Sequence, residues 1–378
     1  MTDLVVLSLE AWDQVWRRNQ HLVAGLLRDD PDLRVLFVEP AADPLYELVS
    51  RRRPRAGRGL RSLVLDGVAP ERLWAFQPTK LLPRRLARNH DVRAARAVRR
   101  VARRLGFRAP LLWVNDPAGA ALLELTDWPA LYDITDDWLE AERTPAEHAR
   151  LVRDEALLMD RAAEVVVCSP GLARTKGARR PVTLVPNAVD VAAYRIPRGR
   201  PSDLPAGPVA LYLGTVHPDR VDLDLCVATA TALRDRGRLV LVGPAPLGPG
   251  DAARLAGTGV VLLGPRHRDD VPAYLQHADV LVVPHVVTPF TDSLDPIKLY
   301  EYRAVGRPVV STPVAGFRDS GDPRVTVIDA AGFPDAVARA LPASSRFPEG
   351  ADEAVPTWAD RVAQMREVIA RAGRGSLR

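Results

Sequence analysis

Short apolar segments of three to six residues recur along the chain, separated by stretches long enough to form amphipathic helices. Strands of this length that are rich in Val, Leu and Ile are typical of a sheet that is buried on both faces. Alternation of strand and helix therefore predicts parallel sheets with helices on both sides. The expected strands form two series, 4–9, 34–38, 73–76, 111–114, 131–134, 165–168 and 183–185, then 209–213, 239–242, 260–263, 280–283 and 308–311.

Between the two series lies a stretch rich in residues that end helices and strands. It begins at Pro186-Asn187-Ala188-Val189-Asp190 and continues through four prolines and two glycines up to Pro208. We predict an N-terminal domain over 1–190, a linker over 191–208 and a C-terminal domain over 209–345. In 346–378, an amphipathic stretch over 358–372 predicts a helix that can cross back to the first domain. Two such Rossmann-like domains imply a cleft between them, with functional residues on the loops that follow strands.

Composition narrows the class of protein. No apolar run approaches the roughly 18 residues that a membrane-spanning helix needs, and the N-terminal apolar run has acids at both ends. Cys168 and Cys226 are too few for a disulfide framework or a zinc site, and both follow apolar residues of predicted core elements. These features predict a cytoplasmic protein with buried, reduced thiols.

Basic residues are concentrated in one part of the chain. Residues 51–108 hold 18 basic side chains and three acids, whereas residues 109–160 hold three basic and 12 acidic side chains. We expect an exposed loop over Arg51–Arg61 and an amphipathic helix over 91–105 with arginines from Arg93 to Arg104 on its outer face. Such a surface can attach to anionic lipid on the inner face of a plasma membrane, or it can be a solvated face over an ordinary core helix. The apolar face is expected at Ala94, Val98, Val101 and Leu105.

The most specific motif starts a helix in the second series. Pro296 suits the first turn of a helix, Gly306 its C-terminal end, and Pro308 starts the next strand. Lys298 and Glu301 share one face near the N-terminus, where backbone N–H groups favour a phosphate. The lysine can meet a diphosphate and the glutamate can accept hydrogen bonds from ribose hydroxyls, unless the two form an ordinary surface ion pair.

The run Pro-x-Lys-Leu-x-Glu-Tyr-x-Ala-x-Gly-x-Pro-Val-Val over 296–310 resembles the donor-binding helix of GT-B fold glycosyltransferases of the family 4 type. The likeness is greatest to bacterial enzymes that build teichuronic acids and exopolysaccharides. Further motifs occur in the expected order, so the resemblance extends from about residue 4 to residue 315. They are 16–20, 132–138, Cys168-Ser169-Pro170, 185–190, Gly214-Thr215-Val216 and Gly264-Pro265-Arg266.

The resemblance implies a nucleotide-sugar donor held by the C-terminal domain, an acceptor held by the N-terminal domain and no obligatory metal. Glu301 would bind the ribose, Lys298 and the 214–216 loop with Thr215 would hold the diphosphate, and Arg266 would lie near the base. Ser293 and Pro296 complete the implied donor site. Many relatives carry a glutamate eight positions before the one at 301, where this chain has Ser293, so that this carboxylate is missing unless Asp292 substitutes for it.

An inverting transfer also needs a base that deprotonates the acceptor hydroxyl. Asp133, Asp136 and Asp137 cluster at the end of a predicted strand in the first domain, and Asp136 is the first choice. They can equally be helix-capping carboxylates, because Asp is a preferred cap residue. A retaining enzyme would not need this base.

An aromatic, arginine-containing loop follows the first predicted strand. Trp12, Asp13, Trp16 and Arg18 can receive a sugar or a lipid-linked phosphate on the acceptor side. Alternatively, Trp16 belongs to the core face of the first helix.

No metal or cofactor site is predicted. His217, His267 and His285 lack ligand spacing, and Asp222 and Asp224 lie at an expected helix start, where carboxylates cap. The G-x-G-x-x-A run at 248–253 does not directly follow a strand, so it is not a dinucleotide fingerprint.

The sequence therefore favours a hexosyltransferase-type glycosyltransferase that moves a sugar from a nucleotide-sugar donor to a cell-envelope or exopolysaccharide acceptor, glycan or lipid-linked. Two alternatives remain. One is a nucleotide-sugar epimerase or hydrolase of the same architecture. The other is a non-catalytic anion-binding protein; nucleic acid is not an expected partner, because base-stacking aromatics are not interleaved with the arginines.

Overall fold

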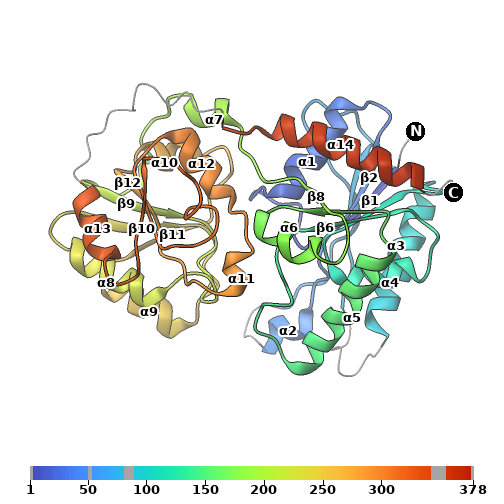
Figure 1. Cartoon of the computed structure of the whole chain (residues 1–378), viewed down its shortest axis with the longest axis horizontal. Coiled ribbons are helices and arrows are strands. Elements are labelled where there is room, and N and C mark those ends of the chain that lie inside the picture. Colours follow the sequence, from blue (N-terminus) through green and yellow to red (C-terminus); the bar gives the residue numbers. More distant parts are fainter. Residues whose placement is uncertain (1–2, 50–52, 81–88, 342–354, 376–378) are drawn as a thin grey trace. The chain divides into compact units, whose positions relative to one another are not determined.

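The computed structural model describes residues 3–49, 53–80, 89–341 and 355–375. The chain divides into two compact units, one formed by residues 1–186 and 359–378 and the other by residues 187–358. Each unit is a sheet with helices on both faces (Figure 1). No helix in the described ranges is both long enough and apolar enough to cross a bilayer.

The first unit contains an eight-stranded sheet in the order β3-β4-β2-β1-β5-β6-β7-β8. Seven strands are parallel, and β3 pairs antiparallel with β4. The elements are β1 (Asp3–Leu7), α1 (Arg18–Asp29), β2 (Arg34–Val38), α2 (Pro44–Val49), β3 (Gly59–Ser62), β4 (Leu73–Gln77), α3 (His90–Arg104), β5 (Leu111–Val114), a 3-10 turn (Pro117–Gly119), α4 (Ala120–Leu123), β6 (Ala130–Ile134), α5 (Pro145–Arg161), β7 (Glu164–Val167), α6 (Pro170–Gly177), β8 (Thr183–Leu184) and α14 (Trp358–Gly375).

The second unit contains a six-stranded parallel sheet in the order β11-β10-β9-β12-β13-β14. Its elements are α7 (Val191–Arg195), β9 (Val209–Leu213), α8 (Leu223–Leu233), β10 (Arg238–Val242), α9 (Pro249–Gly257), β11 (Val261–Gly264), α10 (Val271–Gln276), β12 (Val280–Val283), α11 (Pro289–Asp292), α12 (Ile297–Val305), β13 (Val309–Ser311), β14 (Val325–Val327) and α13 (Phe333–Ala340).

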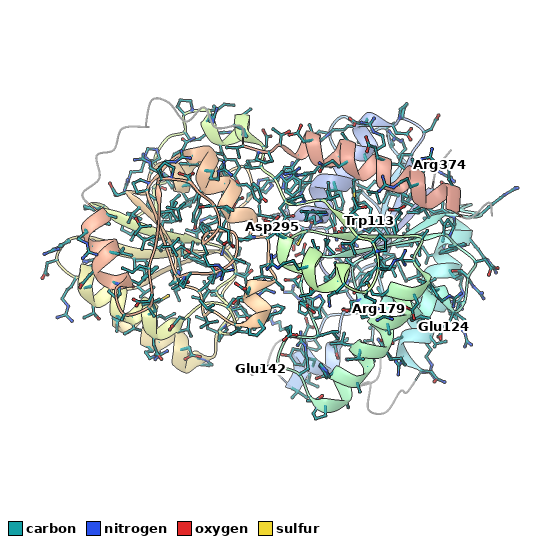
Figure 2. The ribbon with its side chains drawn as sticks, in the orientation of Figure 1. Trp113, Glu124, Glu142, Arg179, Asp295 and Arg374 are labelled. Atoms are coloured by element: carbon teal, nitrogen blue, oxygen red, sulfur yellow. The ribbon has the colours of Figure 1, made fainter. Side chains whose placement is uncertain are left out.

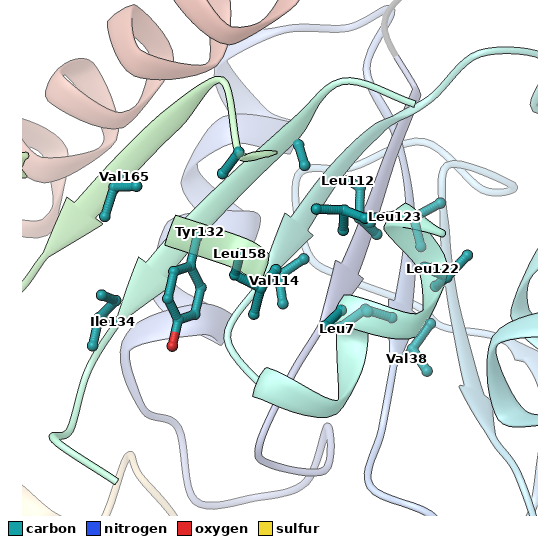
Figure 3. Packing of buried hydrophobic residues seen from close by; sticks show 14 of the residues in the cluster. Leu7, Val38, Leu112, Val114, Leu122, Leu123, Tyr132, Ile134, Leu158 and Val165 are labelled. Atoms are coloured by element: carbon teal, nitrogen blue, oxygen red, sulfur yellow. The ribbon is translucent and has the colours of Figure 1, made fainter. Parts of the chain in front are cut away.

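One core of the first unit lies between its sheet and the helices α3, α4 and α5. Alternate strand residues enter it from one face of the sheet, so that Leu7, Val114 and Tyr132 belong to one buried cluster with Leu158 of α5 (Figure 3). Burial of this apolar surface stabilises the unit by about 25 cal/mol for each Å² removed from water. The same packing holds the carboxyl ends of β1, β5 and β6 in fixed positions. The polar residues that follow these strands are therefore also held in place.

Four expectations for the first unit need correction. The stretch 51–61 is not an exposed loop throughout, because Gly59–Ser62 form β3; Arg51 and Arg52 lie outside the described residues. Trp16 does not belong to a helix face, because α1 begins at Arg18. Not every sheet pairing is parallel. The apolar face of α3 centres on Ala95, Val98 and Ala102, one position away from the expected Ala94, while Val101 and Leu105 pack partly against the core.

The segment 191–208, which we predicted as a linker, contains α7 and contributes to a core. Val189, Tyr194 and Leu204 are buried in the apolar cluster beneath the sheet of the second unit. The prolines around α7 limit its length but do not prevent burial of its side chains. The chain passes from one unit to the other after Pro186, and the segment from 359 onward belongs to the first unit as α14.

Candidate functional site

The loop after β9 comes very close to the side chain of Lys298. Gly214 has φ +140°, which side chains other than glycine rarely adopt, and a Cβ at this position would lie 3.0 Å from Lys298 Nζ, so that the lysine would have to shift to make room for it. The N–H groups of Gly214 and Val216 donate to Val242 and Pro244. The N–H of Thr215 has no partner among the described residues, which leaves it available for a ligand oxygen.

Helix α12 carries both predicted donor residues and is held firmly in its unit. Pro296 precedes its first residue, and Gly306 ends it in the left-handed conformation with φ 75°. Tyr302 is buried, and its hydroxyl accepts a hydrogen bond from Leu213 N at 3.0 Å. This bond ties the helix to the end of β9 and so keeps Lys298 beside the Gly214 loop.

The ammonium of Lys298 points inward and meets neutral groups. It donates to the Tyr212 hydroxyl at 2.9 Å, lies 3.2 Å from His285 Nε2, and lies 4.1 Å from the centre of the Tyr212 ring. Within the described ranges no carboxylate forms an ion pair with it. Burial, assisted by the charge of Arg220, lowers the pKa of Lys298 to about 7. The surface ion pair of Lys298 with Glu301, the alternative considered above, is not formed.

The surroundings of Lys298 favour an anion. Burial first, then Lys298 and Arg220, lower the pKa of His285 well below its ordinary value, so that this ring is neutral at pH 7. The Arg220 guanidinium also lies 5.1 Å from the centre of the Phe290 ring, near the start of α11. Two cationic side chains and the free N–H of Thr215 therefore converge without a neighbouring carboxylate that pairs with the lysine.

Glu301 lies one turn further along α12. Its Oε1 accepts a hydrogen bond from the Tyr194 hydroxyl of α7 at 2.5 Å. Burial raises the pKa of Glu301, while the bond from Tyr194 and the charge of Lys298 oppose that shift. Within the described part of the chain the second carboxylate oxygen, Oε2, has no hydrogen-bond partner, so that Tyr194 orients the group and leaves one acceptor for a ligand.

The residues before α12 are fixed by hydrogen bonds rather than directed at a ligand. Asp295, labelled in Figure 2, accepts from Asn187 N at 2.5 Å and from the Tyr300 hydroxyl at 2.9 Å. Ser293 is buried and its hydroxyl donates to Phe290 O. Asp292, the candidate for the missing carboxylate, forms an ion pair with Arg318 at 2.8 Å.

Arg266 does not join the group around Lys298. Its guanidinium donates to the Tyr274 hydroxyl at 2.7 Å, to the backbone and to Asp203. These contacts fix the loop after β11 against the segment that contains Asp203. All of these partners belong to its own unit, and the predicted role of Arg266 near the base stays a prediction.

In the first unit, Asp133 is the centre of a buried polar network. Arg18 donates to both of its carboxylate oxygens at 3.2 Å, and Trp113 (Figure 2) and Asn115 donate to Oδ2. Asp133 has no exposed surface and Arg18 is 4% exposed. These contacts favour a structural role for both residues, because the carboxylate is saturated with donors.

The two other aspartates differ in their surroundings. Asp137 is buried, and its Oδ1 accepts from Lys176 Nζ at 2.8 Å. Asp136 is half-buried, and its Oδ2 accepts from the Thr135 hydroxyl at 3.0 Å. Asp136 is therefore the most accessible carboxylate of the three at the end of β6.

The loop after β1 is anchored by a buried carboxylate. Glu39 accepts hydrogen bonds from Trp12 N and from the guanidinium groups of Arg58 and Arg61. The Trp12 and Trp16 rings meet edge to face at 5.7 Å. Two arginines of the basic stretch thus hold the tryptophan loop in place.

Asp13 lies at the exposed turn of that loop. Its Oδ1 accepts a hydrogen bond from Val15 N. The carboxylate therefore shapes the turn that precedes Trp16 and stays exposed on the acceptor-side loop.

Helix α3 presents the basic face that the sequence predicted. Its outer arginines are exposed and form no ion pair within the described ranges; they are Arg93, Arg96, Arg100, Arg103 and Arg104. Uncompensated positive charge of this kind favours an anionic surface.

Four residues around the candidate donor site were missed by sequence reasoning: Tyr194, Tyr212, Arg220 and His285. Tyr212 lies at a strand position, where an aromatic side chain is expected in any core. The group of residues that surrounds Lys298 is formed only by folding. In the described residues no cluster of His, Cys, Asp and Glu has the arrangement of a metal site, and Cys168 and Cys226 are buried free thiols.

Residues 207–342, which make up most of the second unit, match the family model described as glycosyl transferases group 1. A putative teichuronic acid biosynthesis glycosyltransferase of Bacillus subtilis is 24% identical over 218 residues, which is 53% of this chain and 55% of that protein. The match therefore spans about half the length of that relative.

Two solved structures illustrate the likeness of fold. The catalytic domain of starch synthase IV from Arabidopsis thaliana, bound to ADP and acarbose, has a TM-score of 0.65 and 13% identity, with 98% of this chain and 99% of that chain covered. Anabaena HepE in complex with UDP-glucose has a TM-score of 0.65 and 14% identity, with 98% and 100% covered. These likenesses confirm the predicted α/β fold with two Rossmann-like units of the GT-B type.

Proposed function

We propose that this chain, whose residues 207–342 form a glycosyl transferases group 1 domain, moves a sugar from a nucleoside diphosphate donor to a hydroxyl group of an acceptor. The observation that carries the proposal is the partly buried ammonium of Lys298, which has neutral hydrogen-bond partners beside the free N–H of Thr215. A buried cation without a carboxylate is costly, and the diphosphate of a donor supplies the missing negative charge.

In this mechanism, Lys298, Thr215 and Arg220 stabilise the charge that develops on the leaving diphosphate. Glu301 accepts hydrogen bonds from the ribose through its free oxygen, oriented by Tyr194. No metal is required for these steps, because the charge is stabilised by side chains and backbone. Asp136 acts as the base if the transfer inverts the anomeric centre.

The acceptor is a cell-envelope or exopolysaccharide glycan. The named activity of the Bacillus subtilis relative and the UDP-glucose complex of Anabaena HepE support this class of donor and acceptor.

Ligand binding tests the donor site. Isothermal titration with UDP, GDP and ADP should show selective binding of one diphosphate, and Lys298→Met should weaken it by about 3 kcal/mol or more, as expected for a charge-assisted contact in a buried site. Arg339→Met, an exposed change on α13 of the same unit, is the control. The proposal is contradicted if UDP, GDP and ADP bind with equal affinity and Lys298→Met leaves those affinities unchanged.

The chemical class is tested by product analysis. Incubation with the donor alone should leave it intact, and addition of an acceptor should yield a glycosylated product and the nucleoside diphosphate. Conversion of the donor sugar without acceptor would instead identify an epimerase, and release of free sugar would identify a hydrolase.

We further propose that the protein acts at the inner face of a plasma membrane, where α3 would bring it to a lipid-linked acceptor. Each arginine near an anionic surface contributes about 1 kcal/mol, so that the triple change of Arg96, Arg100 and Arg103 to Gln should weaken binding to phosphatidylglycerol vesicles about 100-fold. The same change of Arg234, Arg236 and Arg339 is the control. An affinity for vesicles that does not change with salt concentration or with the content of anionic lipid would contradict this attachment.

A further inference from the structure

A cavity of about 250 Å³ lies in the first unit, and none of its lining residues belongs to the candidate donor site. The loop after β6 and the helices α5 and α6 line it. The lining residues are Asp137, Leu139, Glu140, Glu155, Met159, Thr175, Lys176 and Arg179. Its volume equals that of about eight water molecules, which suits one sugar ring.

Three charged side chains that are almost fully buried form one wall. Lys176 Nζ donates to Asp137 Oδ1 at 2.8 Å and to Glu155 Oε1 at 2.7 Å. The exposed fractions of Asp137, Glu155 and Lys176 are 5%, 5% and 7%. The two carboxylates raise the pKa of Lys176 against the effect of burial, so that the ammonium stays charged.

This wall has unused hydrogen-bonding capacity. An ammonium has three N–H donors, and two of them are accounted for by Asp137 and Glu155. The Oε2 atom of Glu155 has no partner among the residues that the structure describes. A donor and an acceptor therefore lie side by side on the cavity wall, which is the pattern that vicinal hydroxyl groups match, because each hydroxyl both donates and accepts.

The remaining lining defines the character of the ligand. Met159 and Leu139 supply an apolar surface for the C–H face of a sugar ring. Two carboxylates around one ammonium leave the wall with a net negative charge. Arg179 (Figure 2) does not offset it, because its guanidinium is paired with Asp160 at 2.7 Å. An anionic group would meet repulsion in this cavity.

We propose that this cavity binds an uncharged sugar ring of the acceptor, held by hydrogen bonds from its hydroxyls to Lys176 and Glu155. The proposal rests on the proposed glycosyl transfer. It adds that the recognised acceptor unit is a neutral sugar rather than a uronate or a sugar phosphate. Asp137 of the cavity wall directly follows the candidate base Asp136 in the chain, although Asp136 itself does not line the cavity.

Saturation-transfer NMR on the full chain tests the site with three probes: methyl glucoside, methyl galactoside and methyl glucuronide. At least one of the neutral glycosides should bind, about tenfold or more tightly than the glucuronide. Leu139→Trp, which fills the cavity from its partly exposed side, should weaken that binding about tenfold or more. Leu184→Trp, on the exposed surface of β8 in the same unit, should leave it unchanged.

A second variant tests the charge argument. Glu155→Gln keeps the size of the side chain and removes one negative charge, so that the preference for the neutral glycoside over the glucuronide should decrease. Failure of both neutral glycosides to bind, equal binding of the glucuronide to the wild type, or insensitivity to Leu139→Trp overturns the proposal. Titration with the nucleoside diphosphate in the same samples reports on the donor site separately, so that failure of the cavity is distinguished from failure of the proposed function.

Discussion

Raising the pH from 7 to 9 should weaken binding of a nucleoside diphosphate, because the amine of Lys298 must be protonated to hold it. The pKa of this group is about 7 in the free protein. A diphosphate beside the amine favours the charged form and raises the pKa in the complex. Binding above pH 7 therefore takes up a proton.

The magnitude follows from linkage. Half of Lys298 is protonated at pH 7 and about 1% at pH 9, so that affinity should fall about 50-fold between these values, or about 2.3 kcal/mol. At pH 8 the complex should take up about 0.9 proton. The two groups that contact the amine do not titrate in this window, because the pKa of His285 is lowered well below its ordinary value and burial raises the pKa of Tyr212. The phosphate itself titrates near pH 6, below the window.

Isothermal titration in two buffers of different ionisation enthalpy measures both quantities. Lys298→Arg, which is charged at every pH used, should bind with an affinity that is flat from pH 7 to 9 and without proton uptake. A wild-type protein that binds the diphosphate with constant affinity over this range, or without proton uptake at pH 8, would refute the assigned environment of Lys298.

The stability of the free protein should change in the opposite direction. The pKa of Lys298 is lower in the folded chain than in the unfolded chain, where it is about 10.4, so the unfolded state binds more protons above pH 7. Stability relative to Lys298→Met should therefore rise with pH from 7 to 10, by up to about 1.4 kcal/mol per unit. Urea unfolding at fixed pH measures the difference.

Three further results are expected. Tyr194→Phe should lower affinity for the diphosphate about five- to tenfold, because Glu301 loses the bond that orients it, and should affect a 2′,3′-dideoxy nucleotide less; an equal loss for both would contradict the ribose contact. Asp136→Asn should lower turnover at least 100-fold with KM little changed, and near-normal turnover would remove the base proposal. Arg18→Met should lower the free energy of unfolding, measured with urea, by about 3–5 kcal/mol, because Asp133 is left buried without its ion-pair partner. A decrease of less than about 1 kcal/mol would contradict the structural role of Arg18 and Asp133.

Much of the fold was predictable because parallel strands carry continuous apolar runs. The segments 34–38, 111–114, 209–213 and 280–283 were predicted with the boundaries that the structure shows. β3 was missed because Gly59-Leu60-Arg61-Ser62 has no apolar run; it is stabilised by pairing with β4 and by the bonds of Arg61 to Glu39. Neither stabilising contact is visible in a local pattern.

The candidate site was predictable where it is local in sequence and unpredictable where it depends on distant contacts. Lys298 and Glu301 share one helix, so that their spacing indicated a common face. Tyr194 and His285 reach the same region from α7 and from the end of β12, a relation that only folding creates. Asp133 was weighed as a base because Asp after a strand is typical of catalysis, yet Arg18 saturates it from 115 positions away.

Because lysine is scarce in this chain, few side-chain amines can react with an amine-acylating reagent. Of 52 basic side chains only Lys80, Lys176 and Lys298 are lysines. Amine-acylating reagents attack the uncharged form, which Lys298 populates near neutrality, whereas the carboxylates around Lys176 keep that amine charged. Brief acylation near pH 8, followed by peptide mass analysis, should therefore modify Lys298 far more readily than Lys176. A bound diphosphate should protect Lys298 from the reagent. The extent of acylation at Lys298 then measures occupancy of the donor site, even when the sugar is unknown.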